Sequence, residues 1–330
     1  MSMGYQGSLG LKQETALGEE AAAPEVFAEF KSESLDMNNN LIRTVTVNGT
    51  RLIKRMLPGA VDAGGGIVLS LSPEGATPWL LKGLFGEVSS GEAAAGVYDH
   101  TFSPTNGKFL PSFTVKVDHD SGCQNWIGCT VGSATLTIAP DNLLDLSVEM
   151  LAQRPKAATA ATPSYSAVAP WGAFGVEFTF NGTGRWDFRR FGLTISNNVT
   201  PIRTLNGKRW AGRHAPGILE ARGTVTFEFA SDAERRRMWG GVSAETPQNT
   251  LAPGSLVMTV THTSEVAKGY YYTLTLNMPE IYYEAAPANI TSASSLVTQT
   301  VTFYASHNAA TDKTIEMILR NGVSGYPNPE

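Results

Sequence analysis

Few residues in this chain have the types and spacing that catalysis or metal binding requires. Residues 118–120 (Asp-His-Asp) could begin a metal site, because carboxylates and imidazoles are metal ligands. The related position later in the chain, residues 261–263, reads Thr-His-Thr, so we interpret the earlier triplet as the end of a surface loop. The motifs G-x-S-x-G, G-x4-G-K-S/T and H-E-x-x-H do not occur. We therefore predict no catalytic residue, no metal, no cofactor and no enzymatic activity.

Cysteine, glycine and arginine clusters are weaker candidates for chemistry. Cys123 and Cys129 are the only cysteines, and two thiols cannot complete a tetrahedral metal site alone. We interpret them as a reduced pair, with a disulfide as the alternative. The glycines at 64–66 are too few for a phosphate-binding loop and precede a predicted strand. The three arginines at 235–237 are most simply the solvated face of a helix.

Arginine pairs are the charged feature that recurs. Arg51 and Arg55 lie four residues apart in an expected strand, and Arg209 and Arg213 repeat this spacing. Side chains four apart on a strand leave the same face. A guanidinium binds a carboxylate with two parallel hydrogen bonds, and acids outnumber bases in this chain. We therefore expect salt bridges within or between subunits, with contacts to nucleic-acid phosphates as the alternative.

Composition limits the classes of protein that the chain can be. Apolar residues make up 42% of it, enough for packed cores, whereas charged residues make up only 17%. So few charges suit a protein that covers much of its surface in an assembly. The formal net charge of −5 argues against tight nucleic-acid binding, which needs a dense basic face. No apolar run is long enough to cross a membrane as a helix, so we expect no membrane association.

The elements that position these residues have a period of two rather than 3.6. Alternating runs rich in Val, Thr, Tyr and Phe predict half-buried strands. These runs are residues 43–47, 113–117, 134–138, 223–229, 256–262 and 272–277. Two helices are predicted: residues 78–85, with Thr77 as N-cap, and residues 235–239, after a capping box that begins at Ser231. The chain is therefore expected to be mainly β.

An internal repeat organises the chain. Residues 48–65 align without a gap with residues 206–223, at an offset of 158, and eight of the eighteen positions are identical. Further alternating segments match beyond this stretch. We therefore predict two copies of one unit with a shared fold, in residues 26–152 and 184–308. Residues 153–183 are expected to form a linker, and residues 1–25 and 309–330 are interpreted as an arm and a tail outside the two cores.

Turns and strand faces can be assigned within each copy. Asn48-Gly49 and Asn206-Gly207 stand between alternating runs and predict type I′ hairpins. Ahead of each helix, the apolar side chains of one strand are expected to pack under that helix; they are Ile67, Leu69, Leu71 and Val225, Phe227, Phe229. The opposite face then carries Val68, Ser70, Thr224, Thr226 and Glu228.

Short motifs spread over about residues 14–305 resemble the tail tube proteins of tailed bacteriophages. They are residues 14–18 (ETALG), 24–27 (PEVF), 32–35 (SESL) and 58–65 (PGAVDAGG). The nearest resemblance is to the class in which one chain carries two tube domains. It implies two tandem β-sandwich or barrel domains, each with one flanking helix, that assemble as trimeric, pseudo-hexameric rings stacked into a tube. The repeat supports this class independently.

The resemblance also implies a function and partners. The chain would be a structural virion protein, assembled in the host cytoplasm, that conducts double-stranded DNA during ejection. Its partners would be copies of itself, other tail proteins at the tube ends, and a tape-measure protein or sheath. We expect Ser70, Thr224, Thr226 and Glu228 to face the lumen, and Arg51, Arg55, Arg209 and Arg213 to lie at the subunit interface. The 1–25 arm and the 87–112 loop are expected to reach neighbouring rings.

Two other classes remain as alternatives. A β-sandwich module of a virion adhesin could hold carbohydrate on a loop cluster of aromatics. Trp171, Trp186 and residues 270–272 (three tyrosines) could supply such a cluster. A jelly-roll enzyme is the third interpretation, weakened by the missing metal ligands.

Overall fold

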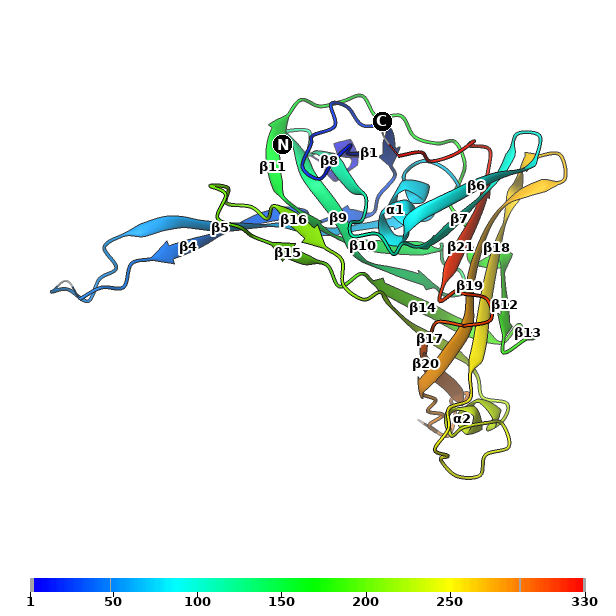
Figure 1. Cartoon of the computed structure of the whole chain (residues 1–330). Coiled ribbons are helices and arrows are strands. Elements are labelled where there is room, and N and C mark those ends of the chain that lie inside the picture. Colours follow the sequence, from blue (N-terminus) through cyan, green and yellow to red (C-terminus); the bar gives the residue numbers. More distant parts are fainter. Residues whose placement is uncertain (1–2, 48, 291, 329–330) are drawn as a thin grey trace.

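The computed structural model describes residues 3–47, 49–290 and 292–328, and they form a mainly β structure, as predicted. Strand pairings in the main sheet are antiparallel throughout. Two α-helices lie in the described part of the chain, α1 (Ala76–Phe85) and α2 (Ala233–Met238). A long hairpin projects from the body on one side, and α2 lies at an end of the molecule (Figure 1).

The first half of the chain builds a sheet in the order β2-β1-β8-β9-β10-β5-β4. A short strand, β3, also pairs with β5. The bounds are β1 (Ser8–Gln13), β2 (Val26–Ala28), β3 (Ser32–Glu33), β4 (Asp36–Arg43), β5 (Met56–Ser70), β8 (Ser112–Asp118), β9 (Cys123–Ile138) and β10 (Asp145–Ala152).

The second half repeats this order as β13-β12-β18-β19-β20-β17-β14. Each strand therefore has a counterpart with the same neighbours. The bounds are β12 (Val176–Phe180), β13 (Thr183–Arg185), β14 (Phe188–Ser196), β17 (Glu220–Glu228), β18 (Gly254–Ala267), β19 (Tyr270–Ala285) and β20 (Thr298–Ala305).

Register is conserved between the halves at the offset found in the sequence. Met37 pairs with Ala63, and Ile195 pairs with Ala221, so both partners shift by the same 158 positions seen in the sequence repeat. The hairpins beyond these pairs keep the register too, since Ile42 pairs with Leu57 as Thr200 pairs with Ala215.

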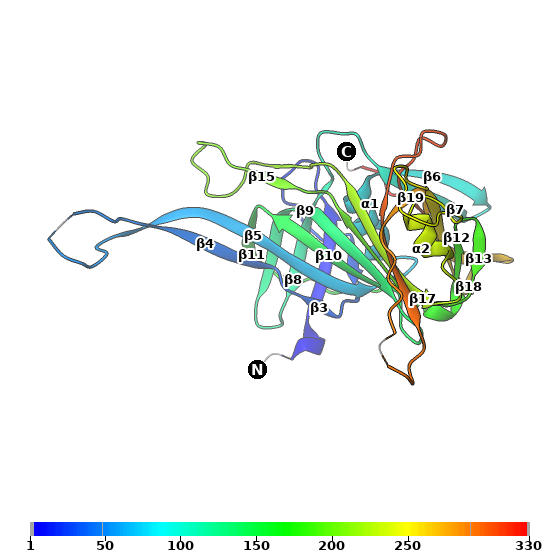
Figure 2. The same ribbon diagram turned by 90° about the horizontal axis from the view of Figure 1, so that it is seen from below.

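The two halves share one continuous sheet. Strand β14 of the second half pairs with β17 on one side and with residues 133–138 of β9 on the other. Along one edge of β9, residues 123–130 pair with β8 and residues 133–138 pair with β14. Figure 2 shows β9, β10 and β17 as parts of this sheet.

The remaining elements extend or cover the sheet. Strand β21 pairs with β19 and with β7, and thereby connects the hairpin β6–β7 to the second half. Their bounds are β6 (Gly86–Ala94), β7 (Val97–Pro104), β11 (Arg154–Ala158), β15 (Thr200–Ile202), β16 (Arg213–Ala215), β21 (Glu316–Asn321) and the 3-10 turns η1 (Gly4–Gln6) and η2 (Ala173–Gly175).

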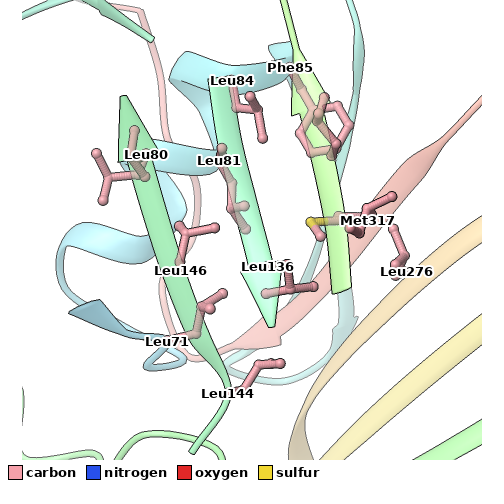
Figure 3. Packing of buried hydrophobic residues seen from close by; sticks show 14 of the residues in the cluster. Leu71, Leu80, Leu81, Leu84, Phe85, Leu136, Leu144, Leu146, Leu276 and Met317 are labelled. Carbon is pink, nitrogen blue, oxygen red and sulfur yellow. The ribbon is translucent and has the colours of Figure 1, made fainter. Parts of the chain in front are cut away.

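In the first half, the core lies between α1 and the sheet. Every residue of α1 is buried, and Leu80, Leu81 and Leu84 lie over Leu136 and Leu146 of the sheet (Figure 3). Gly86 ends the helix in the left-handed region, with φ 89°, and its N–H reaches the Lys82 carbonyl. The N-cap is Gly75 rather than Thr77, whose hydroxyl accepts a hydrogen bond from the Ser72 N–H instead.

Helix α2 does not cover its half in the same way. None of its residues is buried, and no side-chain cap forms at its N-terminus, so the predicted capping box is absent. Phe227 packs instead against the rings of Phe180 and Phe188. The predicted apolar sets of the two strands are otherwise buried, except Phe229, which lies just beyond β17 and is half-buried.

The chain termini correct a second expectation. Residues 1–25 and 309–330 do not lie outside the cores, because β1 pairs with β8 and β21 pairs with β19. Strand β1 places Leu9 and Leu11 in the core, and β21 does the same for Met317 and Leu319. The pairings of β1 with β8 and of β21 with β7 join segments that are far apart in the sequence, which a local pattern does not reveal.

Other connecting segments also differ from expectation. Residues 87–112 hold the hairpin β6–β7 rather than a loop. The expected linker, 153–183, contains β11, which pairs with β9, and β12, which pairs with β18. The expected strand at 43–47 continues β4 only to Arg43.

The type I′ turn predicted at Asn206-Gly207 does not form. The second hairpin has a ten-residue loop between Ile202 and Arg213, and Asn206 does not take the positive φ that a type I′ turn needs. Asn48 lies outside the described residues. Gly49 and Gly207 nevertheless share the same left-handed conformation, with φ 74° and 75°.

Candidate assembly surfaces

The residues considered first for catalysis form no site. His119 Nε2 lies 2.9 Å from the Glu33 carboxylate, and Asp118 accepts a hydrogen bond from the Asp120 N–H. No group of three or more His, Cys, Asp or Glu within 3–47, 49–290 and 292–328 could hold a metal ion. Cys123 and Cys129 are free thiols, and burial raises the pKa of both. No helix in the described residues is long and apolar enough to cross a membrane.

The aromatic residues considered for carbohydrate binding do not form one exposed cluster. Trp171 lies in the core, and Tyr272 is buried as well. Trp186 is exposed between β13 and β14, and Tyr270 begins β19. The structure therefore does not supply the loop cluster that the adhesin interpretation requires.

The side of the continuous sheet that faces away from the core is polar. On β17, Thr224, Thr226 and Glu228 alternate with the buried Val225 and Phe227. We call this side the polar face; it includes Ser70, Thr135, Asp145, Thr194, Arg222, Thr224, Thr226, Glu228, Thr300 and Thr302. Hydroxyl pairs link its strands: Thr135 with Thr194 at 3.0 Å and Thr226 with Thr300 at 3.1 Å.

Three basic side chains on or beside the polar face lie in ion pairs, whereas Arg190, which pairs with Thr226, forms no ion pair with the described residues. Lys31 Nζ contacts Asp145 at 2.6 Å, and Ser70 donates a hydrogen bond to the same carboxylate. Arg189 pairs with Glu228 on the neighbouring strand at 2.8 Å, and Arg222 of β17 reaches across β20 to Glu284 of β19 at 2.5 Å. The Glu284 carboxylate raises the pKa of the Arg222 guanidinium. The positive charges of these three side chains are therefore matched locally by carboxylates.

The hairpin β15–β16 attaches the second half to the base of the first. The Arg209 guanidinium donates to the Gly59 carbonyl at 2.8 Å and to Asn39 Oδ1 at 2.7 Å. The Val61 N–H donates to the Arg209 carbonyl at 2.8 Å, and Arg203 pairs with Asp62. Arg209 therefore lies at a junction between the halves, as a ligand of backbone and amide oxygens rather than of an acid.

The other three arginines of the predicted interface stay apart from this junction. The side chains of Arg51, Arg55 and Arg213 make no hydrogen bond or ion pair with any part of the chain that the structure describes. Arg51 and Arg55 also lie beyond β4 and before β5, in the loop rather than on a strand. The structure therefore does not bring the four arginines together within one chain.

Two buried polar side chains complete the junction between the halves. Asn197 Nδ2 donates to the Leu84 and Val131 carbonyls at 2.8 and 3.1 Å. His214 Nδ1 lies 3.0 Å from the Thr130 hydroxyl, and burial lowers the pKa of this imidazole to about 4. Neither residue was singled out from the sequence. The identity of Asn39 and Asn197 at equivalent positions was a signal that could have pointed to one of them.

An exposed apolar hairpin is the most unusual surface. We call residues 41–47 and 49–57, the distal part of the hairpin β4–β5, the arm, which is distinct from the N-terminal segment 1–25; it projects away from the body (Figures 1 and 2). Its exposed large hydrophobic residues are Leu41, Ile42, Val45, Val47, Leu52, Ile53, Met56 and Leu57. Such a patch on a protein of low charge content marks a surface that another molecule covers.

The polar sheet face and the exposed apolar arm are features of a protein whose surface is covered by other molecules. A family model described as phage tail tube protein matches residues 4–305. The chain therefore belongs to the phage tail tube protein family and is a structural component of the virion tail. A comparison with curated proteins gave no match to the chain.

Proposed function

We propose that this chain is the major tail tube subunit, in which residues 26–152 and 184–308 are the cores of two tube domains. Residues 153–183 connect the domains, and residues 1–25 and 309–330 add strands to them. Three chains would close a pseudo-hexameric ring of six domains, and rings would stack into the tube that conducts DNA during ejection.

The pairing of β14 with β9 is the observation that carries this proposal. Two halves with the same strand order are joined edge to edge into one sheet. Each half thus offers one edge and accepts another, so the same joint can be repeated between chains until a ring closes. The polypeptide supplies one such joint, and every further one needs a second chain.

The polar face is proposed to line the lumen, with Ser70, Thr224, Thr226 and Glu228 exposed to it. Threonine and serine hydroxyls present no net charge to DNA phosphates. The ion pairs of Arg189 and Arg222 with Glu228 and Glu284 reduce the attraction of those cations for phosphate. DNA could then pass along the face without being retained.

The remaining partners follow from the position of a tube in a tail. We propose contacts with tail proteins at the tube ends and with a tape-measure protein or sheath. Assembly would take place in the host cytoplasm, and the mature protein would reside in the virion. Catalysis has no part in this proposal.

Sedimentation analysis combined with negative-stain microscopy tests it. We expect the purified chain to form rings or tubes as its concentration rises, with a smallest closed species of three chains. A monomer at high concentration with intact β circular dichroism would refute the proposal.

A further inference from the structure

We infer that residues 32–38 of one chain pair with residues 285–290 of a second copy, with Asp36 opposite Pro287. This inference rests on the proposed function and specifies its joint between chains. Within the chain, β14 of the second half pairs with β9 of the first half. Residues 32–38 are the equivalent of β14 in the first half, and residues 285–290 are the equivalent of the end of β9 in the second half.

The first segment is the counterpart of β14. Ser32, Asp36 and Met37 pair with residues of β5. The residues 158 positions later lie in β14, and they pair with the equivalent residues of β17 in the same register. Whereas β14 has β9 on its other side, β3 and β4 pair only with β5 in the described residues. Residues 32–38 therefore present an open sheet edge.

The second segment is the counterpart of the end of β9. Val131 pairs with Met150 just as Tyr283 pairs with Phe303, and both pairings have a bulge one residue further along. An isolated bridge from Ala288 to Gln299 continues the same register. Residues 285–290 thus correspond to residues 133–138, the part of β9 that β14 covers.

The exposure of two isoleucines shows what is missing from the second segment. Ile138 ends β9, pairs with Phe191 of β14 and is 6% exposed. Ile290 occupies the equivalent position and is 81% exposed. A strand placed on residues 285–290 as β14 lies on β9 would cover it.

Backbone groups on the two edges are complementary. The Leu35 and Met37 N–H groups are held by the carboxylates of Glu33 and Asp36, at 3.0 and 2.7 Å. On the other edge, the Ala286 and Ala288 carbonyls accept hydrogen bonds from the side chains of Gln299 and Arg235.

The inferred register brings these groups together, with Leu35 opposite Ala288 and Met37 opposite Ala286. Donors that are capped by side chains on one edge then face acceptors that are capped by side chains on the other. Main-chain hydrogen bonds between the two copies would replace all four caps.

The arm adds a second contact in the same direction. On the hairpin of the second half, Ala211 and His214 are 4% and 3% exposed. Their counterparts on the arm, Ile53 and Met56, are 45% and 57% exposed. The arm therefore lacks the partner that its counterpart has within the chain.

The correspondence between the arm and the hairpin β15–β16 also indicates where the arm lies on the second copy. Arg51, the counterpart of Arg209, would reach the Gly217 carbonyl as Arg209 reaches Gly59. A surface pocket lined by Asn197, Gly217 and Leu219 lies at that place. The second copy that receives residues 32–38 on its 285–290 segment would thus also receive the arm.

Disulfide trapping tests the register. Asp36 and Pro287 are exposed, and they would form a non-hydrogen-bonded pair, whose short Cα separation of about 4.5 Å suits a disulfide. A chain carrying Asp36→Cys, Pro287→Cys and Cys123→Ser should form cross-linked dimers and trimers on mild oxidation. Thr135→Cys with Thr194→Cys, the equivalent pair inside the chain, is the matched positive control and should cross-link within monomers.

The outcomes separate this inference from the proposed function. We expect at least tenfold more intermolecular cross-linking than for Asp36→Cys with Asn289→Cys, which is two positions out of register. Rings that form, as seen by microscopy, without this preference would overturn the inference and leave the proposed function standing. A chain that remains monomeric would overturn both.

Discussion

The ring of Phe303 on β20 fills the space beside Gly223 on the paired strand β17. A Cβ built on Gly223 would lie 2.1 Å from the Phe303 Cζ atom. The backbone of Gly223 is not in the left-handed region, so this position needs glycine for space and not for conformation.

Replacing Gly223 with Ala should therefore destabilise the second half. Phe303 must leave its rotamer or the strands must separate, and overpacking of this kind costs about 1–3 kcal/mol. Urea unfolding measures the change. Gly192→Ala on the neighbouring strand is the matched control, because nothing lies within 4 Å of its Cβ position. Equal effects of the two substitutions would contradict this explanation.

Asn197→Ala should weaken the junction between the halves. The substitution leaves the Leu84 and Val131 carbonyls without their side-chain donor in a buried site, which costs about 1–3 kcal/mol. Asn142→Ala, at an exposed asparagine, should change the free energy of unfolding by less than about 0.5 kcal/mol. A negligible effect of Asn197→Ala in urea unfolding would show that the two bonds do not hold the junction.

Lys82 should make stability depend on pH in the alkaline range. Its buried Nζ donates to Gln13 Oε1 and to the Tyr326 and Pro327 carbonyls, and burial lowers its pKa from 10.5 to about 8. Between these values the unfolded chain holds the proton and the folded chain does not. This group therefore increases stability as pH rises from 8 to 10.5, by up to ~1.4 kcal/mol per pH unit.

The difference in unfolding free energy between the unmodified chain and Lys82→Met isolates this contribution from other titrating groups. It should move in favour of the unmodified chain from pH 7 to pH 10. A difference that stays constant over this range would exclude the shifted pKa.

His214 should act in the acidic range, and its contribution to stability also rises with pH. The folded chain keeps this imidazole neutral down to a pKa of about 4, whereas the unfolded chain takes up the proton near pH 6.5. Stability is therefore lost as pH falls from 6.5 to 4. His214→Met, which copies the residue at the equivalent Met56, should reduce this acid sensitivity in thermal unfolding. His307→Ala, at an exposed histidine, should leave it unchanged.

Equivalent arginines should have different roles because one is already engaged within the chain. Arg209→Glu removes the bonds to Gly59 and Asn39 and should lower the free energy of unfolding. Arg51→Glu should leave that free energy unchanged and instead raise the concentration at which assemblies form. Sedimentation and urea unfolding of both variants distinguish the two effects; the same response from both would contradict the assignment.

Sequence patterns revealed the regular part of the fold. Alternation placed Val225 and Phe227 in the core correctly, and the repeat at 48–65 and 206–223 matches a register that the two halves share. These features are local or are visible by comparing the chain with itself.

Long-range pairing and buried polar contacts could not be read in the same way. Strand β1 pairs with β8, about a hundred residues further along the chain. Strand β21 pairs with β19 and with β7, which belongs to the first half of the chain. Glu234 looked like part of a capping box, yet its carboxylate accepts hydrogen bonds from Asn181 and Tyr283. Local sequence cannot show whether the Glu234 carboxylate binds its own helix N-terminus or Asn181 and Tyr283, because the latter two come close only after the sheet has formed.

Counting chains in an image reconstruction of the assembled tube tests the central claim most directly. We expect each ring to contain three chains and six similar domains, with the polar face toward the lumen. Residues 32–38 of one chain should lie beside residues 285–290 of the next. A ring of six chains, or a lumen lined by the opposite face of the sheet, would contradict the account.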